Sequence, residues 1–141
     1  MLSHAAIYCI RGLIYVASRQ DRTFIPISEI SKFLNISFHF LTKIFQKLTQ
    51  HDILVSNRGP KGGISFKRPP DAIYVSDLVN IIDGPEIFDK CVLGLPGCGS
   101  DAPCPMHDHW SVVKKHMLNQ FQNTTIAELA AKVSDRNERI R

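Results

Sequence analysis

Apolar residues recur at helical spacing through the first third of the chain, between short polar breaks. An apolar stripe over residues 4–18 predicts an amphipathic helix that ends at polar residues 21–23. A second, short helix is expected after Pro26, because proline suits the first turn of a helix. A tight turn follows, and Ser37 is a good N-cap for a third helix with one apolar face. Two short helices joined by a brief turn predict a helix-turn-helix.

A β-hairpin is predicted directly after the third helix. Residues 53–56 and 64–66 have the composition of short strands, and the segment Arg58–Gly63 between them contains three glycines. The glycines allow a tight reversal of the chain. The predicted fold class is therefore mainly α with a small β-hairpin: a winged helix-turn-helix plus a long C-terminal dimerisation helix.

The second half of the chain contains helices on both sides of a long break. A helix is expected from Val75 to Asp83, where Gly84 ends it, and a final short helix over residues 126–133. We therefore divide the chain into a DNA-binding domain (1–84), a cysteine-rich segment (85–105), the dimerisation and C-terminal helices (106–133) and a charged tail (134–141). The tail is expected to fray.

The long helix has an apolar stripe whose members are four or three positions apart, the spacing of a two-helix seam. Such a stripe packs either against the chain's own core or against a second copy. Because a chain of 141 residues has little core left for it, we favour a homodimer. The predicted interface residues are Met106, Trp110, Val113, Met117 and Phe121.

Basic residues are concentrated in the first half of the chain. Residues 1–70 contain ten Lys/Arg and three Asp/Glu, a net charge of +7, whereas residues 71–141 have a net charge of −3. This asymmetry is typical of a nucleic-acid-binding protein, although an unevenly charged surface would look the same. A winged helix that binds protein instead of DNA is a further alternative, which salt-dependent duplex binding would exclude.

The candidate DNA-binding residues lie on the polar face of the third helix and at the hairpin tip. A tip with little side-chain bulk suits a narrow minor groove, and the helix suits the major groove of double-stranded DNA. A two-fold symmetric dimer would require a palindromic operator. The helix contributes Ser37, His39, Thr42, Lys43, Gln46 and Lys47, and the tip contributes Arg58, Gly59, Lys61 and Gly62.

Three of the four cysteines fall within fourteen residues, and a histidine follows the last of them. Cys91, Cys98, Cys104 and His107 offer thiolate and imidazole ligands among glycines and prolines. This donor set suits an iron–sulfur cluster, most simply of the 2Fe-2S type, and equally a tetrahedral zinc site. We favour the cluster, because the spacing differs from the paired CxxC knuckles of zinc fingers. Free thiols or a disulfide remain alternatives.

The sequence shows neither a secretory signal nor a stretch of membrane-spanning length. We therefore expect a cytoplasmic protein with no membrane partner, in which clustered cysteines more often bind metal than form structural disulfides. An enzyme is not expected, because a Cys104–His107 pair would lack an oxyanion hole and a third orienting group.

The chain resembles the Rrf-two family of winged-helix transcription regulators, of the IscR/NsrR type. The resemblance rests on residues 8–13, on the hairpin segment Arg58–Gly63, on Ile82-Asp83-Gly84 and on the run from Cys104 to His107. It implies a homodimeric repressor or activator that senses iron–sulfur status, nitric oxide or redox stress. Other members of the family have lost the cysteines and sense something else. The alternative for this chain is a regulator of the same family without a cluster, which acts through cysteine thiols, zinc or a small effector.

The resemblance also implies which residues hold the cofactor. Cys91, Cys98 and Cys104 match the family's three cluster cysteines, and His107 matches the fourth ligand of the branch that regulates iron–sulfur assembly. The first gap is one residue longer here than in that branch. Ile7 stands where the nitric-oxide branch has a ligating aspartate from the partner, and isoleucine cannot ligate.

Overall fold

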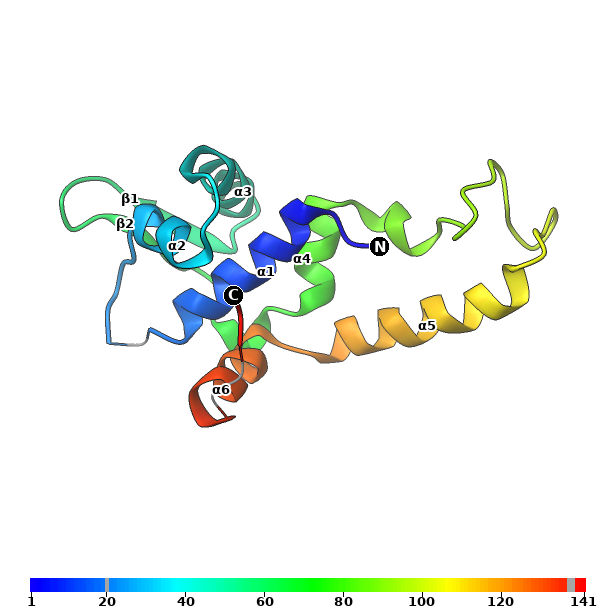
Figure 1. The fold of residues 1–141 in the computed structure, drawn as a ribbon. Coiled ribbons are helices and arrows are strands. Elements are labelled where there is room, and N and C mark those ends of the chain that lie inside the picture. Colours follow the sequence, from blue (N-terminus) through cyan, green and yellow to red (C-terminus); the bar gives the residue numbers. More distant parts are fainter. Residues whose placement is uncertain (20, 137–138) are drawn as a thin grey trace.

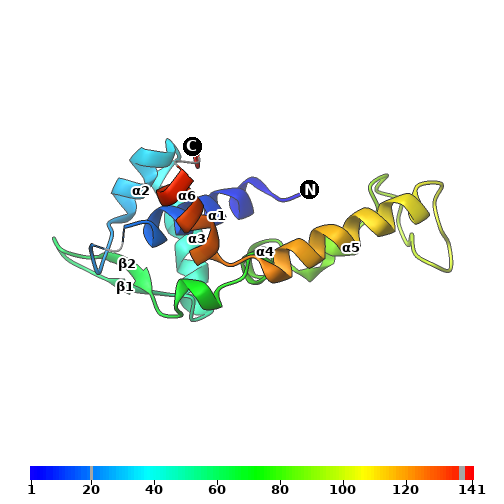
Figure 2. The same cartoon turned by 90° about the horizontal axis from the view of Figure 1, so that it is seen from below.

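The computed structural model describes residues 1–19, 21–136 and 139–141. In these ranges, α-helices and one two-stranded antiparallel sheet form a body from which α5 projects (Figures 1 and 2). This confirms the predicted class, mainly α with a hairpin. The elements are α1 (His4–Ala17), α2 (Ile27–Leu34), α3 (Phe38–Gln50), β1 (Leu54–Asn57), β2 (Gly63–Phe66), the 3-10 turn η1 (Pro70–Ala72), α4 (Val75–Ile82), the 3-10 turn η2 (Pro85–Phe88), α5 (His107–Asn123) and α6 (Ile126–Arg136).

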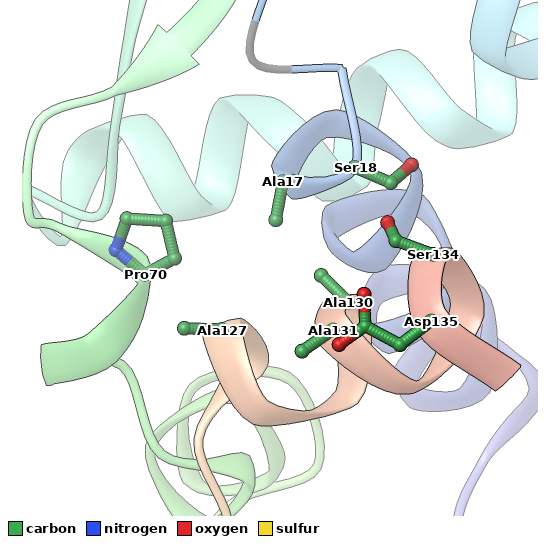
Figure 3. A pocket seen from close by; sticks show the side chains of 8 residues that line it. All are labelled: Ala17, Ser18, Pro70, Ala127, Ala130, Ala131, Ser134 and Asp135. Atoms are coloured by element: carbon green, nitrogen blue, oxygen red, sulfur yellow. The ribbon is translucent and has the colours of Figure 1, made fainter.

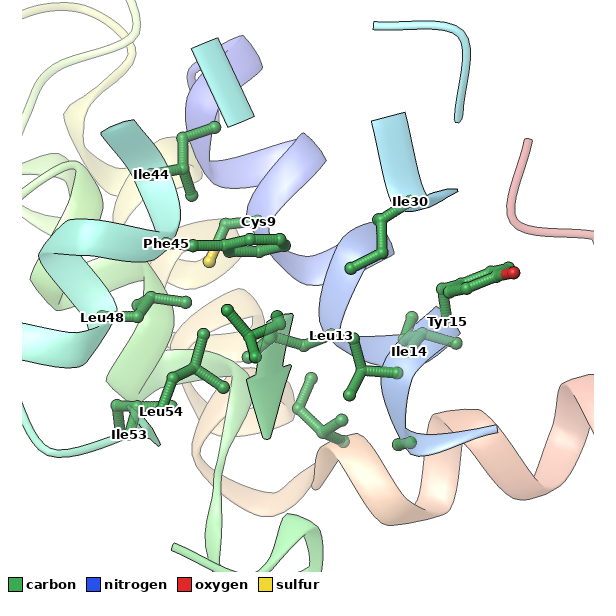
Figure 4. Close-up of a cluster of buried hydrophobic side chains, with 14 of the residues drawn as sticks. Cys9, Leu13, Ile14, Tyr15, Ile30, Ile44, Phe45, Leu48, Ile53 and Leu54 are labelled. Carbon is green, nitrogen blue, oxygen red and sulfur yellow. The ribbon is translucent and has the colours of Figure 1, made fainter. Parts of the chain in front are cut away.

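Helix α1 lies at the centre of the body and contacts α2, α3, α4 and α6. Its buried side meets α3 around Leu13 and Phe45, both at most 1% exposed (Figure 4). Gly12 allows this approach, since a Cβ there would lie 2.9 Å from the Phe45 ring. Cys9 is fully buried in the same cluster and acts as a small apolar side chain.

The hairpin is fastened to the segment that precedes α2. Its strands pair from Leu54 opposite Phe66 to Asn57 opposite Gly63. Ile25 and Ile64 also exchange backbone hydrogen bonds of 3.0 and 2.9 Å. Gly63 makes this possible, because its φ is +147° and a Cβ would lie 2.2 Å from the Ile25 carbonyl oxygen.

A polar network fixes α1 relative to α2. Glu29 accepts a 2.6 Å hydrogen bond from the Tyr15 hydroxyl and two bonds from Arg22, of 2.5 and 2.7 Å. The Arg22 guanidinium, opposed in part by desolvation, holds the pKa of Glu29 at about 2. The Tyr15 bond thus joins α1 to α2, and the bidentate pair joins the intervening segment to α2.

Part of the α5 stripe packs against the chain itself. Met117 and Phe121 lie against a second cluster of Val75, Val79 and Phe88, and the Phe88 and Phe121 rings are 6.2 Å apart. Of the stripe, Val113 stays most exposed, at 51%. The alternative of own-core packing therefore accounts for the inner end of α5, and the dimer interface remains a prediction.

The C-terminal tail differs from its prediction. Helix α6 runs to Arg136 instead of ending at residue 133. Beyond it Ile140 packs on the main core and accepts a hydrogen bond from Arg11, and the Arg141 guanidinium lies 5.0 Å from the centre of the Phe33 ring. The expectation of fraying was wrong for residues 139–141, because an apolar side chain and a cation find partners on α1 and α2. Residues 137–138 of the tail lie outside the described ranges.

Residues 89–106, named here the cysteine loop, join η2 to the outer end of α5 (Figure 1). The cysteine-rich segment was expected to begin at residue 85, but its first four residues form η2. In the part of the chain that the structure describes, no helix has the length and apolar content needed to cross a bilayer.

Candidate metal centre and nucleic-acid interface

The cysteine loop brings three sulfur atoms together. The Sγ atoms of Cys91, Cys98 and Cys104 all lie within 4.8 Å of one another. Those of Cys91 and Cys104 are 3.2 Å apart, although the residues are thirteen positions apart in the sequence. Cys104 is buried and the other two cysteines are half-buried. Three sulfurs at this separation can ligate one metal ion or one face of a cluster.

Glycine turns give the loop its course. Gly94 and Gly97 both have φ of +68°, in the left-handed region that favours glycine. The Gly94 N–H donates to the Cys91 carbonyl at 3.0 Å, which closes the first turn. The Leu93 N–H donates to the Cys91 sulfur at 3.4 Å. Backbone donors to a cysteine sulfur stabilise its thiolate, the form that binds metal.

The thiols differ in acidity because two of them share a hydrogen bond. The contact with Cys104, helped by the Leu93 amide, lowers the pKa of Cys91 to about 7. The same contact, together with burial, raises the pKa of Cys104 to about 11. Burial raises the pKa of Cys9 far above its ordinary range, and the charge of Asp83 adds to the rise. Of these three thiols Cys91 therefore ionises most readily, and the buried Cys9 thiol stays protonated.

His107 was predicted as the fourth ligand, but its imidazole lies outside the sulfur group. Within the described residues that group consists of the three cysteines alone. His107 is the first residue of α5, and its backbone N–H donates to the Cys104 carbonyl at 3.0 Å. This bond fixes its backbone one turn from Cys104, while no hydrogen bond to another described residue orients the ring.

The donor set fits an iron–sulfur cluster in number and softness. Three thiolates come from a loop whose backbone is shaped by glycine, and a fourth position is left for another ligand. The same set fits zinc, which takes three cysteines and one histidine in structural sites. The three thiols therefore form a candidate soft-metal site, and their arrangement fits either occupant.

The predicted DNA-binding residues lie on α3 and at the hairpin tip. Ser37 caps α3, accepting a 3.4 Å hydrogen bond from the Phe40 N–H. The helix residues His39, Lys43, Gln46 and Lys47 are exposed, and Thr42, half-buried, bonds to the Phe38 carbonyl at 2.8 Å. At the tip Arg58, Gly59 and Lys61 are exposed. Gly62 is buried, because it folds back against the Asn57 carbonyl.

The surface between α3 and the hairpin is hollowed. A hollow of about 500 Å³ lies between them, lined on the α3 side by Thr42 and Gln46 and on the hairpin side by Ser56. The hollow thus lies between α3 and the strands of the hairpin, and the residues of the basic tip are not part of its lining.

Two hydrogen bonds that the sequence did not indicate join the N-terminus of α1 to the C-cap of α4. The Ser3 N–H donates to the Asp83 carboxylate at 2.9 Å, and the Ser3 hydroxyl donates to its other oxygen. Ser3 is also the N-cap of α1, accepting from the Ala6 N–H at 3.0 Å. A serine directly before an apolar stripe could have been predicted as an N-cap. Its bond to Asp83, 80 residues away, could not have been predicted from the sequence.

Another hollow, of about 380 Å³, lies between the end of α1, Pro70 and α6 (Figure 3). Its lining is mostly small, with Asp135 as its one charged residue among those described. It offers no cluster of ligating or nucleophilic groups, so the candidate chemistry stays with the cysteine loop.

A helix-turn-helix followed by a basic hairpin is the element order of the winged-helix class. Residues 2–132 match the model of the Rrf2 family, described as "Iron-dependent Transcriptional regulator". The chain belongs to this family, whose members are DNA-binding regulators and not enzymes.

Curated relatives agree with this assignment. An HTH-type transcriptional regulator of Aquifex aeolicus is 31% identical over 124 residues, covering 86% of this chain and 85% of the relative. The HTH-type transcriptional regulator IscR of Sodalis glossinidius is 29% identical over 124 residues, covering 88% of this chain and 74% of the relative.

Solved structures share the fold. CymR, the global cysteine regulator of B. subtilis, superposes with a TM-score of 0.77 at 22% identity, covering 93% of this chain and 96% of that one. IscR of T. potens superposes with a TM-score of 0.76 at 19% identity, covering 99% and 92%. Both likenesses show that the chain shares its overall fold with these regulators.

Alkylation of the metal-free, reduced protein tests the acidity of the thiols. A lowered pKa leaves the thiolate populated above it, so iodoacetamide labelling of Cys91 should rise steeply from about pH 6 to about pH 8. Cys104 should remain unlabelled over that range, and buried Cys9 is the internal control. Mass spectrometry of timed digests measures each site. Labelling of Cys104 before Cys91 would contradict the assignment.

Proposed function

We propose that this protein is a DNA-binding transcription regulator that senses redox, iron–sulfur or nitric-oxide status. In this proposal Cys91, Cys98 and Cys104 hold an iron–sulfur cluster, most simply 2Fe-2S. The observation that carries it is the group of three sulfurs within 4.8 Å, in a chain whose other half is a winged helix. A bound cluster would supply one-electron chemistry and reactivity toward oxidants.

Iron is favoured over zinc as the occupant. The family's description names iron dependence, and the relatives include IscR proteins. His107 would complete the site by turning its ring toward the sulfurs from the first turn of α5, and an imidazole ligand raises a cluster's potential. A ligand from a partner chain would serve equally.

A second candidate is a regulator of the same family without a cluster, acting through thiols, zinc or a small effector. The 3.2 Å approach of Cys91 and Cys104 favours it, because an acidic thiol beside a second thiol can form a disulfide. Iron uptake separates the two candidates.

The sensor and the DNA-binding surface are connected through α1. Asp83, the C-cap of α4 and separated from the loop by η2, accepts hydrogen bonds from Ser3, the N-cap of α1. Five residues on, the Tyr8 ring packs edge-on against Phe40 at 6.0 Å, in the first turn of α3. A change of loop geometry on cluster loss would reach the recognition helix along this route. Such a link has regulatory meaning only if cluster and DNA binding change one another's free energy.

The DNA-bound form is a homodimer with two-fold symmetry on a palindromic operator. Each α3 would enter a major groove, with Arg58 and Lys61 of the same chain in the adjacent minor groove. The half-sites would lie about one helical turn apart, or a multiple of it.

Cluster–DNA linkage is tested with an operator selected anaerobically from random duplexes. Loaded and metal-free wild type should differ at least about fivefold in operator affinity, the lower end of typical coupling energies. Cys98→Ala should bind with one affinity under both conditions, since it loses a ligand. Ser100→Ala, an exposed loop change, is the matched control and should behave as wild type. Equal affinities of loaded and metal-free wild type would refute the sensing proposal.

Salt dependence tests the hairpin tip. Arg58→Ala combined with Lys61→Ala should weaken binding to all duplexes and reduce the slope of log affinity against log salt by about 0.9 for each phosphate that the variant no longer neutralises. Lys115→Ala, which removes one exposed charge from α5, should change neither. Titrations by fluorescence anisotropy at several salt concentrations measure both quantities. An unchanged slope in the double variant would exclude the tip from the interface.

Light scattering tests the dimer. Wild type should be a dimer at micromolar concentration, and Val113→Glu should be a monomer, because it buries an unpaired charge in the seam. Lys115→Glu also adds negative charge to α5 but lies on another face, so it should remain dimeric. A monomeric wild type, or a dimeric Val113→Glu, would show that α5 is not the interface.

A further inference from the structure

Two side chains of α5 hold the entrance of the cysteine loop. The Trp110 Nε1–H donates to the Lys90 carbonyl at 2.9 Å. The Lys114 ammonium donates to the Asp89 carbonyl at 3.3 Å. These two carbonyls belong to the residues directly before Cys91. Helix α5 therefore binds the backbone next to the Cys91 thiol.

The exit of the loop is fixed on the same helix. Cys104 lies one turn before α5, and its carbonyl accepts from the His107 N–H. His107, Trp110 and Lys114 are spaced i, i+3 and i+7, so they share one face of α5. Both ends of the thirteen-residue separation between Cys91 and Cys104 are therefore fastened to one rigid element.

Fastening both ends matters because bringing the ends of a flexible loop together costs conformational entropy. In a loop without these contacts, metal binding itself would have to supply the free energy that offsets this loss of conformational entropy. The Trp110 ring also lines a hollow of about 540 Å³ together with Cys91, Ile87 and Met117. The Trp110 ring thus borders this hollow while its indole N–H binds the backbone at the loop entrance.

We propose that Trp110 and Lys114 are positioning residues that hold Cys91 beside Cys104 before any metal binds. The loop is then a preformed soft-metal site that can be emptied and refilled while the protein stays folded. This inference rests on the proposed metal centre. It gives Trp110, expected at the dimer seam, a role inside its own chain.

The test is titration of the metal-free, reduced full chain with Co²⁺ alone under argon. Thiolate-to-cobalt absorbance reports both affinity and the number of sulfurs bound. Trp110→Phe keeps an aromatic ring but loses the donor, and should weaken Co²⁺ binding about tenfold, at the lower end of effects from groups that orient ligands. Lys114→Met should weaken it less, because its bond is longer and exposed. Lys115→Met, one position along α5, is the control and should match wild type.

Thermal unfolding and light scattering of the metal-free variants separate positioning from general stability. Trp110→Phe and Lys114→Met should melt and assemble as wild type while binding Co²⁺ more weakly. Unchanged Co²⁺ affinity in both variants would overturn the inference, as would a wild type that binds no Co²⁺. If Trp110→Phe fails to fold, Lys114→Met decides alone. A wild type that binds Co²⁺ through three thiolates but takes up no iron and sulfide would refute the proposed cluster and leave this inference standing.

Discussion

The packing of α1 against α2, α3, α4 and α6 is the contact on which the rest of the structure depends. Leu13 and its buried neighbours on α1 supply the centre of the main core (Figure 4). The two ends of α1 have different tasks. In the last turn of α1, Tyr15 donates a hydrogen bond to Glu29 of the helix-turn-helix. At the other end, Ser3 caps the helix and bonds to Asp83. Because a packed core deforms little, a shift at the N-cap would be passed on and not absorbed.

The cysteine loop has the opposite character. It lies outside both apolar clusters, and its course depends on glycine turns and on hydrogen bonds to α5. Segments with few buried apolar contacts are the ones that open at low free-energy cost, and elements that respond to a signal are drawn from them. A soft-metal site at that position can change state while the winged helix stays intact.

Periodicity predicted most of the fold because α1, α2, α3, α4 and α6 each bury apolar residues in the body. Periodicity could not show what covers the apolar stripe of α5. A helix needs the same spacing of apolar residues whether it packs against its own chain or against a second copy. In the structure Met117 and Phe121 pack against the second apolar cluster of their own chain, and Val113 is exposed. The prediction that the C-terminal tail frays was wrong because one apolar residue, Ile140, packs against the main core.

The candidate site was predicted in part. Spacing and residue type indicated that Cys91, Cys98 and Cys104 would act together, and the structure brings their sulfurs together. His107 remained outside the group, because a position one turn away does not fix a side-chain direction. The bonds of Trp110 to Lys90 and of Ser3 to Asp83 join residues 20 and 80 positions apart. No local pattern encodes such partners.

Metal and sulfide analysis of the full chain purified without oxygen tests the central claim most directly. If the three sulfurs hold a 2Fe-2S cluster, the protein should be coloured and contain about two irons and about two acid-labile sulfides per chain. Stoichiometric zinc, or protein that binds its operator tightly with neither iron nor sulfide, would contradict the account.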